Sequence, residues 1–356
     1  MNRLLLIIGL LFSLAITALT ENVQETPPPQ RVNTAIGFYD VITPDEIHKL
    51  TTSDIQKLVR AGWKGAGAVL LYCFEEKVFQ YTSGKYENAT INYRLRMPKN
   101  IRHGRKYPLV VHLHGAGDGG SDNLTSLIHL HSILPVLIGP ESEDFFMLVT
   151  QCPPNSPGWS FNSAKDGNLD VLMAIMEHVI AEYPIDIKRI TATGVSGGGW
   201  GVWELILRHP EMFAGAVPTS CSAPQSQRLA SLKQVPIWSV VNKKDTYISH
   251  ESNQVAMRMI NKSGGSMAVS ESNAAGHNAL RPALEDYNCL RWMLAQRKGS
   301  WVTPPPGTIV HKPNSFLFTF AMFVVPFSFL IFLLRKAIGE QVAIIGQSLL
   351  ERIGKG

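Results

Sequence analysis

Long runs of like charge are absent from this sequence. Among its 356 residues, 33 are lysine or arginine and 28 are aspartate or glutamate, so the formal net charge is only +5. The basic residues are scattered among acidic ones and form no patch, which argues against nucleic acid as a partner. Hydrophobic residues make up 45% of the chain, enough for the core of one large domain with appendages.

Cysteine and clustered metal ligands are also scarce. The four cysteines are Cys73, Cys152, Cys221 and Cys289. An oxidising compartment would favour one or two disulfides among them, and four cysteines allow three pairings. His112 and His114 share one strand face, but no acidic or cysteine partner lies at ligand spacing. We therefore expect no metal and no other cofactor.

Both ends of the chain carry a long apolar run. Residues 2–20 combine the basic Arg3 with an apolar stretch and small residues near its end, which is typical of a signal peptide spanning 1–20. Residues 316–334 carry no charge and are about long enough to cross the hydrocarbon core of a bilayer. A basic pair follows at once and favours a cytoplasmic position for what comes next. The pattern predicts a single-pass membrane protein.

This topology divides the chain into an outer and an inner part. Residues 21–315 are expected on the extracytoplasmic side, whether periplasmic, extracellular or lumenal. The tail at 335–356 has apolar residues at helical spacing and is predicted to be a cytoplasmic amphipathic helix. Proline-rich linkers at 21–33 and 299–315 mark the limits of the folded part.

Strand and helix patterns alternate through residues 90–298, after a partly helical N-terminal extension at 34–89. Continuous apolar runs at 108–115 and 145–152 are typical of strands buried on both faces of a parallel sheet. The remaining predicted strands are 90–98, 189–196, 215–221, 236–245 and 266–272, and the predicted helices are 168–183, 197–210, 252–262 and 283–297. This order predicts an α/β fold with a doubly wound, mostly parallel sheet.

A glycine-rich break ends the strand predicted at 189–196. The stretch Gly194-Val195-Ser196-Gly197-Gly198 fits the pattern GxSxG, in which small neighbours allow a serine to occupy a strained turn. An ordinary strand-to-helix loop is the alternative interpretation. We favour a nucleophile because Ser196 lies at the carboxyl end of a central strand and before a helix, where open α/β sheets bind ligands.

A serine hydroxyl is a poor nucleophile without a base and an acid that orients the base. Asp245 ends one later predicted strand, and His277 lies in a small loop after the last one. The chain order serine, aspartate, histidine is the one that accompanies such a turn. We therefore predict a triad of Ser196, Asp245 and His277, with Asp286 and Glu271 as alternative acids.

A second glycine-rich stretch, HLHGAGDGG at 112–120, follows a predicted buried strand. Its backbone N–H groups are expected to face the serine, so we predict an oxyanion hole formed by the N–H groups of Ala116 and Gly197. His114 is expected to brace this loop and, with Trp159, to border the substrate pocket. The alternative for Trp159 is a structural role, in which it pins its own loop.

Several blocks together resemble a known family. They are YPLVVHLHGAGDGGSDN, LVTQCPPNSPGW, RITATGVSGGGWGVWEL, RHPEMFAGAVPTSC and PIWSVVNKKD. The chain is similar, over about residues 90–297, to the α/β-hydrolase branch that contains polyhydroxybutyrate depolymerase-like, feruloyl-esterase-like and phospholipase/carboxylesterase-type enzymes, also labelled predicted peptidases. Gly197 stands where such enzymes often carry methionine.

The resemblance implies a secreted serine ester hydrolase that uses the triad predicted above, with an ester of unknown identity as its substrate. A serine peptidase or an acyltransferase would use the same residues and stays an alternative. A non-catalytic binding module on the same fold is the third interpretation. The sequence names neither the ester nor the oligomeric state.

Overall fold

The computed structural model describes residues 31–34, 37–40, 44–82, 89–139, 142–153, 158–159, 168–286 and 288–303. The chain divides into two compact units, and all of these residues belong to the first, Met1–Thr308. The predicted signal peptide, membrane span and tail lie outside the described residues. Within the described ranges, every helix is too short or too polar to cross a membrane.

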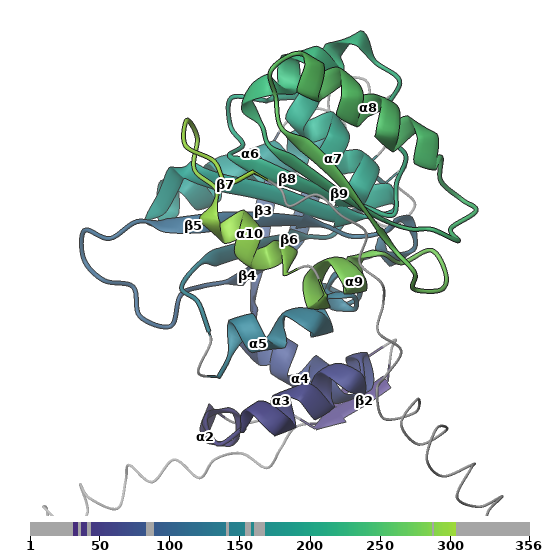
Figure 1. The fold of residues 1–356 in the computed structure, drawn as a ribbon. Coiled ribbons are helices and arrows are strands. Elements are labelled where there is room, and N and C mark those ends of the chain that lie inside the picture. The colour runs from purple at the N-terminus through teal and green to yellow at the C-terminus, as the bar shows by residue number, and fades with distance from the viewer. Residues whose placement is uncertain are drawn as a thin grey trace, which may run out of the picture. The chain divides into compact units, whose positions relative to one another are not determined.

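A single large sheet forms the centre of the first unit (Figure 1). Its strands are β3 (Glu75–Tyr81), β4 (Ala89–Arg96), β5 (Tyr107–Leu113), β6 (Phe146–Thr150), β7 (Ile185–Val195), β8 (Gly215–Thr219), β9 (Ile237–Asn242) and β10 (Met267–Ser272). The order in space is β10-β9-β8-β7-β5-β6-β4-β3. Strands β10 to β6 pair in parallel, whereas β4 and β3 are antiparallel additions. The predicted α/β class and mostly parallel sheet are confirmed.

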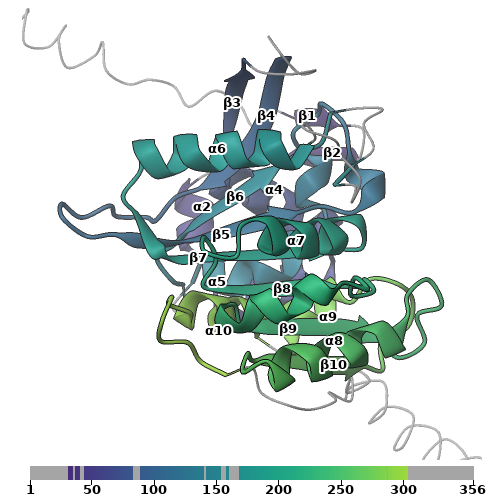
Figure 2. The same ribbon diagram turned by 90° about the horizontal axis from the view of Figure 1, so that it is seen from above.

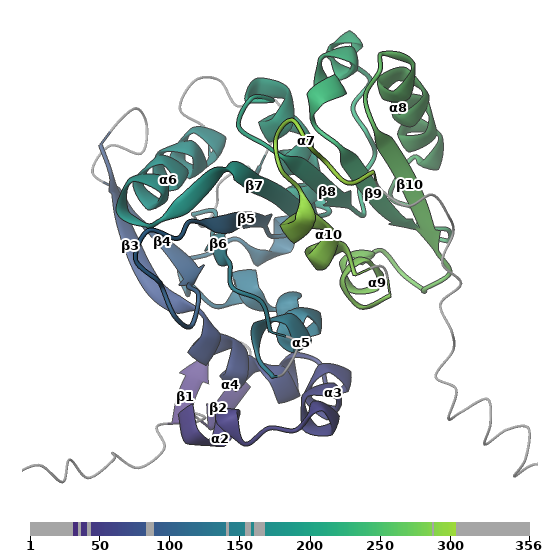
Figure 3. The ribbon, with the colours of Figure 1, turned by 60° about the vertical axis from the view of Figure 1, so that its left-hand side comes forward.

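Helices cover both faces of this sheet. One face carries α6 (Asn168–Glu182), α7 (Gly197–Arg208) and α8 (His250–Lys262), and the other carries α5 (Leu134–Leu137), α9 (Leu280–Glu285) and α10 (Cys289–Ala295) (Figures 2 and 3). The side chains of β5 and β9 are buried along their whole length because helices lie on both sides of them. The shorter turns are η2 (Ala116–Asp118), η3 (Thr125–Leu127), η4 (Leu130–Ile133) and η5 (Gln227–Gln234).

The N-terminal segment forms a small layer of its own. It contains the hairpin of β1 (Arg31–Thr34) and β2 (Gly37–Asp40), followed by α2 (Pro44–His48), α3 (Thr52–Arg60) and α4 (Trp63–Cys73). Helix α3 begins with a capping box, in which Thr51 and Asp54 satisfy each other's backbone N–H groups. Its apolar residues Ile55 and Val59 are buried. Helices α3 and α4 both pack against η4 and α5, below the main sheet (Figure 3).

Two boundaries differ from those predicted. The sheet begins before residue 90, because β3 pairs with β4 along its whole length and so joins part of the predicted extension to the main domain. The single helix predicted at 283–297 is divided into α9 and α10. Asn288 lies between them with φ 54°, a left-handed conformation that ends the helical path.

The expected disulfides do not form between the four cysteines, all of which lie in the described part of the chain. Cys152 follows β6 and Cys221 follows β8, with β5 and β7 between those strands. Three strand spacings of about 4.8 Å separate the two positions by roughly 14 Å, whereas a disulfide requires Cα atoms within about 7 Å. Burial raises the pKa of Cys73 to about 11, so this thiol stays protonated at neutral pH.

Candidate active site

Ser196 occupies the turn between β7 and α7. Its backbone has φ 54° and ψ −116°, a conformation that is uncommon and strained for a residue with a side chain. The turn is held by two backbone hydrogen bonds. The N–H of Ser196 donates to the carbonyl of Thr219 at 3.0 Å, and the N–H of Trp200 donates to the carbonyl of Ser196 at 3.0 Å. This geometry matches the strained turn that the sequence predicts.

The glycines around Ser196 are needed for close backbone contact rather than for unusual dihedral angles. A Cβ atom on Gly198 would lie 2.0 Å from the carbonyl oxygen of Leu113 and 2.5 Å from that of His114. A Cβ atom on Gly194 would lie 2.5 Å from the carbonyl oxygen of Gly198. The start of α7 therefore packs directly on the end of β5, and this contact sets the distance between Ser196 and the loop after β5.

Gly198→Ala is expected to destabilise the fold by about 3 kcal/mol, because the clashing atoms are backbone carbonyl oxygens of the last residue of the central strand β5 and of the residue after it. Gly117→Ala is the matched control, since a Cβ atom there meets nothing within 4 Å. Thermal or urea unfolding of the two purified variants measures the difference. Equal unfolding midpoints for Gly198→Ala and the unmodified protein would contradict the packing described here.

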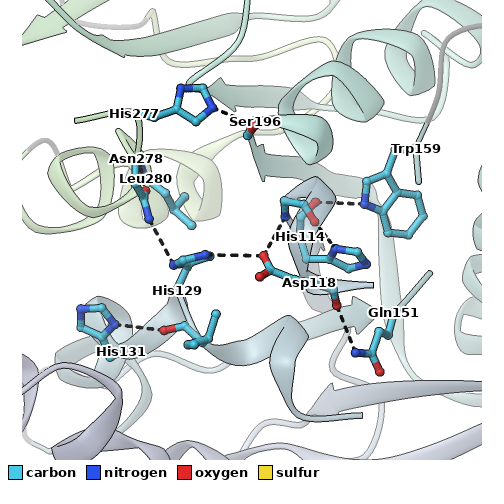
Figure 4. Close-up of polar contacts among 12 residues, drawn as sticks. His114, Asp118, His129, His131, Gln151, Trp159, Ser196, His277, Asn278 and Leu280 are labelled. Carbon is cyan, nitrogen blue, oxygen red and sulfur yellow. Dashed lines mark hydrogen bonds and ion pairs between the residues drawn. The ribbon is translucent and has the colours of Figure 1, made fainter. Parts of the chain in front are cut away.

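Three predicted residues meet in one hydrogen-bonded line. The ring of His277 points at Ser196 (Figure 4), with 2.8 Å between Nε2 and Oγ. The other ring nitrogen, Nδ1, lies 2.6 Å from Oδ2 of Asp245. A carboxylate only accepts hydrogen bonds, so Nδ1 carries the proton and Nε2 is free to accept the proton of the serine hydroxyl. The arrangement orients His277 as a base for Ser196.

Asp245 is held in place as firmly as the ring that it orients. Its side chain is fully buried, and its Oδ1 accepts the backbone N–H of Tyr247 at 2.9 Å. The ring of Tyr247 stands edge-on to the ring of His277, with 5.2 Å between centroids, and is 79% exposed. The alternative acid Glu271 faces His250 instead. Asp245 is thus the carboxylate that contacts His277.

The loop that carries His277 is fastened at two points. The amide of Asn242, at the end of β9, donates to the carbonyl of Gly276 at 2.8 Å. The N–H of Ala279 donates to Oγ of Ser220 at 2.6 Å, and Ser220 is itself fully buried with φ 52°. Both anchors come from strand ends, so the sheet positions the base loop.

The loop after β5 lies against the turn that carries Ser196. A Cβ atom on Gly197 would lie 3.0 Å from the backbone nitrogen of Ala116, so these two backbones meet. This close approach places the N–H groups predicted as oxyanion donors on neighbouring segments beside Ser196. The order in which strands join the sheet reverses between β5 and β7, because β6 lies on one side of β5 and β7 on the other, and open α/β sheets bind ligands at such positions.

His114 and Trp159 lie behind this loop. They are 1% and 4% exposed, so the structure places neither on an open pocket surface. Nε2 of His114 accepts the N–H of Cys152 at 3.0 Å and Nδ1 donates to the carbonyl of Gly115 at 2.6 Å. Burial lowers the pKa of His114, which favours the neutral ring that these two contacts require.

The bond to Gly115 has a consequence for the adjacent N–H group. The carbonyl of Gly115 and the N–H of Ala116 belong to one planar trans peptide and point in opposite directions. His114 therefore aims the N–H of Ala116 away from itself. Trp159 completes the support, because its Nε1 donates to the carbonyl of His114 at 3.0 Å (Figure 4). Both residues thus support the backbone of this loop.

Sequence reasoning did not identify several residues that surround the triad. Tyr247 and Asp118 each lie within three residues of a predicted site residue, so chain proximity was a signal for both. Ser220 lies near the end of a predicted strand and has no further sequence signal. His129 lies between η3 and η4, in a segment without periodic pattern, and its contacts arise only from the fold.

Comparisons with known proteins found similarity among solved structures. No protein-family model matches the sequence, and curated proteins give no match either. Among solved structures, a thermostable esterase superposes with a TM-score of 0.54 and 28% identity over 65% of this chain and 64% of its own. A ferulic acid esterase gives 0.49 and 16% over 62% of this chain and 97% of its own. The S-formylglutathione hydrolase of Staphylococcus aureus gives 0.48 and 14% over 62% and 98%.

The chain therefore spans about two thirds of the length of that thermostable esterase, 64%. This chain has a mostly parallel sheet whose strand order reverses between β5 and β7, with a strained serine directly after β7. These features, with the likeness to the thermostable esterase, are those of an α/β-hydrolase fold.

Proposed function

We propose that this protein is a serine hydrolase that cleaves carboxylic esters through a covalent acyl-enzyme. The observation that carries the proposal is the line from Asp245 through His277 to Ser196, with contacts of 2.6 and 2.8 Å. The packing of the fold alone does not require these three side chains to form such a line. A buried carboxylate, a ring held between two partners and a strained serine together are what nucleophilic catalysis needs.

The proposed reaction follows from the positions of these groups. His277 takes the proton of Ser196 as the serine oxygen attacks the ester carbonyl carbon, and Asp245 stabilises the imidazolium that results. The N–H groups of Ala116 and Gly197 donate to the oxyanion of the tetrahedral intermediate. His277 then gives its proton to the leaving alcohol. Water repeats the sequence on the acyl-enzyme and releases the acid.

An ester is favoured over a peptide because the solved structure that supports this proposal, at 28% identity, is that of an esterase. A peptidase or an acyltransferase would use the same triad with a different pocket or acceptor. The purified protein should be labelled at Ser196 by a fluorophosphonate and should turn over at least one ester from a panel of acetyl, short-chain acyl and feruloyl esters. A labelled protein that cleaves only peptides would show that the substrate is an amide and not an ester. A protein that takes no label would indicate a non-catalytic module.

We further propose that the hydrolase is attached to a membrane and faces away from the cytoplasm. The support is the uncharged run at 316–334, the basic pair Arg335 and Lys336 and the signal-like residues 1–20. The proline-rich segment at 299–315 would hold the catalytic unit away from the bilayer. In this arrangement the membrane segment supplies an address and no catalytic group.

A variant that ends at residue 303 tests this separation, since it keeps the signal-like segment and every described residue. The full chain is expected in the membrane fraction after alkaline carbonate extraction, and the shortened chain in the soluble fraction. Their kcat values on a water-soluble ester should agree within about threefold, because a tether adds no contact to the transition state. A shortened protein that folds but has lost turnover would show that the C-terminal segment belongs to the active site.

A further inference from the structure

A second line of polar contacts lies beside the triad and joins the two loops that carry its working groups (Figure 4). Nδ2 of Asn278 lies 3.1 Å from Nδ1 of His129, and Nε2 of His129 lies 3.5 Å from Oδ2 of Asp118. The same carboxylate oxygen accepts the N–H of Gly115 at 3.1 Å. The line thus runs from the residue after His277 to the residue before Ala116.

We infer that His129 is a positioning residue, which fixes the spacing between the base loop and the oxyanion loop through Asn278 and Asp118. This inference rests on the proposed function, because it assigns a role within that reaction. His129 itself touches neither Ser196 nor His277 in the contacts described here. It acts on catalysis only through the two loops that it connects.

The orientation of the His129 ring follows from its neighbours. Oδ1 of Asn278 accepts the N–H of Leu280 at 3.0 Å, which directs the Nδ2 group of the same amide towards His129. An amide NH₂ group only donates, so Nδ1 of His129 is the acceptor and the ring proton lies on Nε2. That proton points at the carboxylate of Asp118. The neutral ring therefore fits both partners at once.

The Asp118 end of the line controls an atom next to the proposed oxyanion hole. Asp118 is 14% exposed at its side chain, and its Oδ2 holds the N–H of Gly115, whose carbonyl is held by His114. Both polar groups of Gly115 are thus fixed, and with them the peptide that presents the N–H of Ala116. A free Asp118 side chain would release one of these two restraints.

The Asn278 end fixes the base loop in the same way. Asn278 follows His277 directly and precedes Ala279, whose N–H is bound by Ser220. His129 comes from a third segment, the turns between β5 and β6, and lies 149 residues before Asn278 along the chain. It therefore bridges two loops that are distant in sequence. Small changes in the distance between Ala116 and His277 cost rate, because both act on one tetrahedral centre.

The side chain of His129 is 33% exposed and lies outside the hydrophobic core, so its removal should leave the fold intact. His129→Ala is expected to lower kcat by about ten- to a hundredfold with KM within about twofold, and to lower the rate of fluorophosphonate labelling in proportion. His129→Gln should restore kcat to within about threefold, because its amide offers an acceptor and a donor without charge. His131→Ala is the matched control and should leave kcat unchanged, since the hydrogen bond of that ring within the described residues goes to the carbonyl of Ile128.

Asn278→Ala and the double variant Asn278→Ala, His129→Ala complete the experiment. If the residues act as one line, the double variant should be no slower than the slower single variant. Losses that multiply would overturn the inference, as would a His129→Ala protein with kcat within twofold of the unmodified protein. A His129→Gln protein as slow as His129→Ala with an equal melting temperature would overturn it too. An unmodified protein that takes no label would overturn the proposed function itself, which is a different result.

Discussion

Ser196→Ala is expected to lower ester hydrolysis by a factor of about 10³ or more, while thermal unfolding stays within a degree or two. The hydroxyl is the only group lost, and its partner Nε2 of His277 lies 2.8 Å away with nothing else to deprotonate. Alanine adopts the strained backbone of position 196 no less well than serine, since both carry a Cβ atom. Initial rates on an activated ester, together with circular dichroism, measure both quantities.

Ser231→Ala provides the control for this experiment, because Ser231 is exposed on η5 and bonds only locally, to the carbonyl of Arg228. It should retain the full rate. Turnover of Ser196→Ala within tenfold of the unmodified protein would remove Ser196 from the proposed mechanism. Mass spectrometry of the fluorophosphonate adduct would then identify the nucleophile that acts instead.

Asp245→Asn is expected to lower kcat by about 10³ to 10⁴, the second largest effect. The asparagine keeps the acceptor that binds the N–H of Tyr247, so the buried turn should remain intact. Its NH₂ group, however, faces Nδ1 of His277 as a donor and forces the ring proton onto Nε2. The ring then points a proton at Ser196 and no longer accepts one. Steady-state kinetics at neutral and alkaline pH measure the loss.

Asp170→Asn on α6 is a suitable control, because that carboxylate pairs with Arg208 near the surface and not with the triad. Its rate should match that of the unmodified protein. A loss of less than tenfold for Asp245→Asn would mean that a different carboxylate orients His277. Glu271 and Asp286 would then be the residues to replace next.

The central part of the fold was predictable because its signals are local. Strand β5 is a continuous apolar run, and β7 ends in glycines that only a tight turn requires. Parallel strands bring their carboxyl ends to one edge of the sheet, so residues that follow β7, β9 and β10 had to gather there. The triad could therefore be predicted from strand ends alone, without any distance.

The remaining features depend on contacts between distant segments. Strand β3 has no clear alternation of apolar residues and is a strand only because β4 pairs with it. The contact between His129 and Asn278 joins residues 149 positions apart, and one of them lies in irregular turns. The absence of disulfides among the cysteines likewise depends on which strands lie between them. No periodic pattern encodes these relations.

Strand β3 also has a consequence for association between molecules. It lies at one end of the sheet, so among the described strands its outer backbone groups have no partner, and such edges recruit strands from other chains. Its first residues are charged, with Glu75 and Glu76 exposed and Lys77 partly exposed, and charged side chains on an edge strand disfavour that recruitment. A protein begun at residue 90 would lack β3 and make β4 the edge strand, in which the apolar Tyr93 and Leu95 alternate with Arg94 and Arg96. Strand β3 thus covers the edge of β4 against pairing with other chains, while α3 and α4 support η4 and α5.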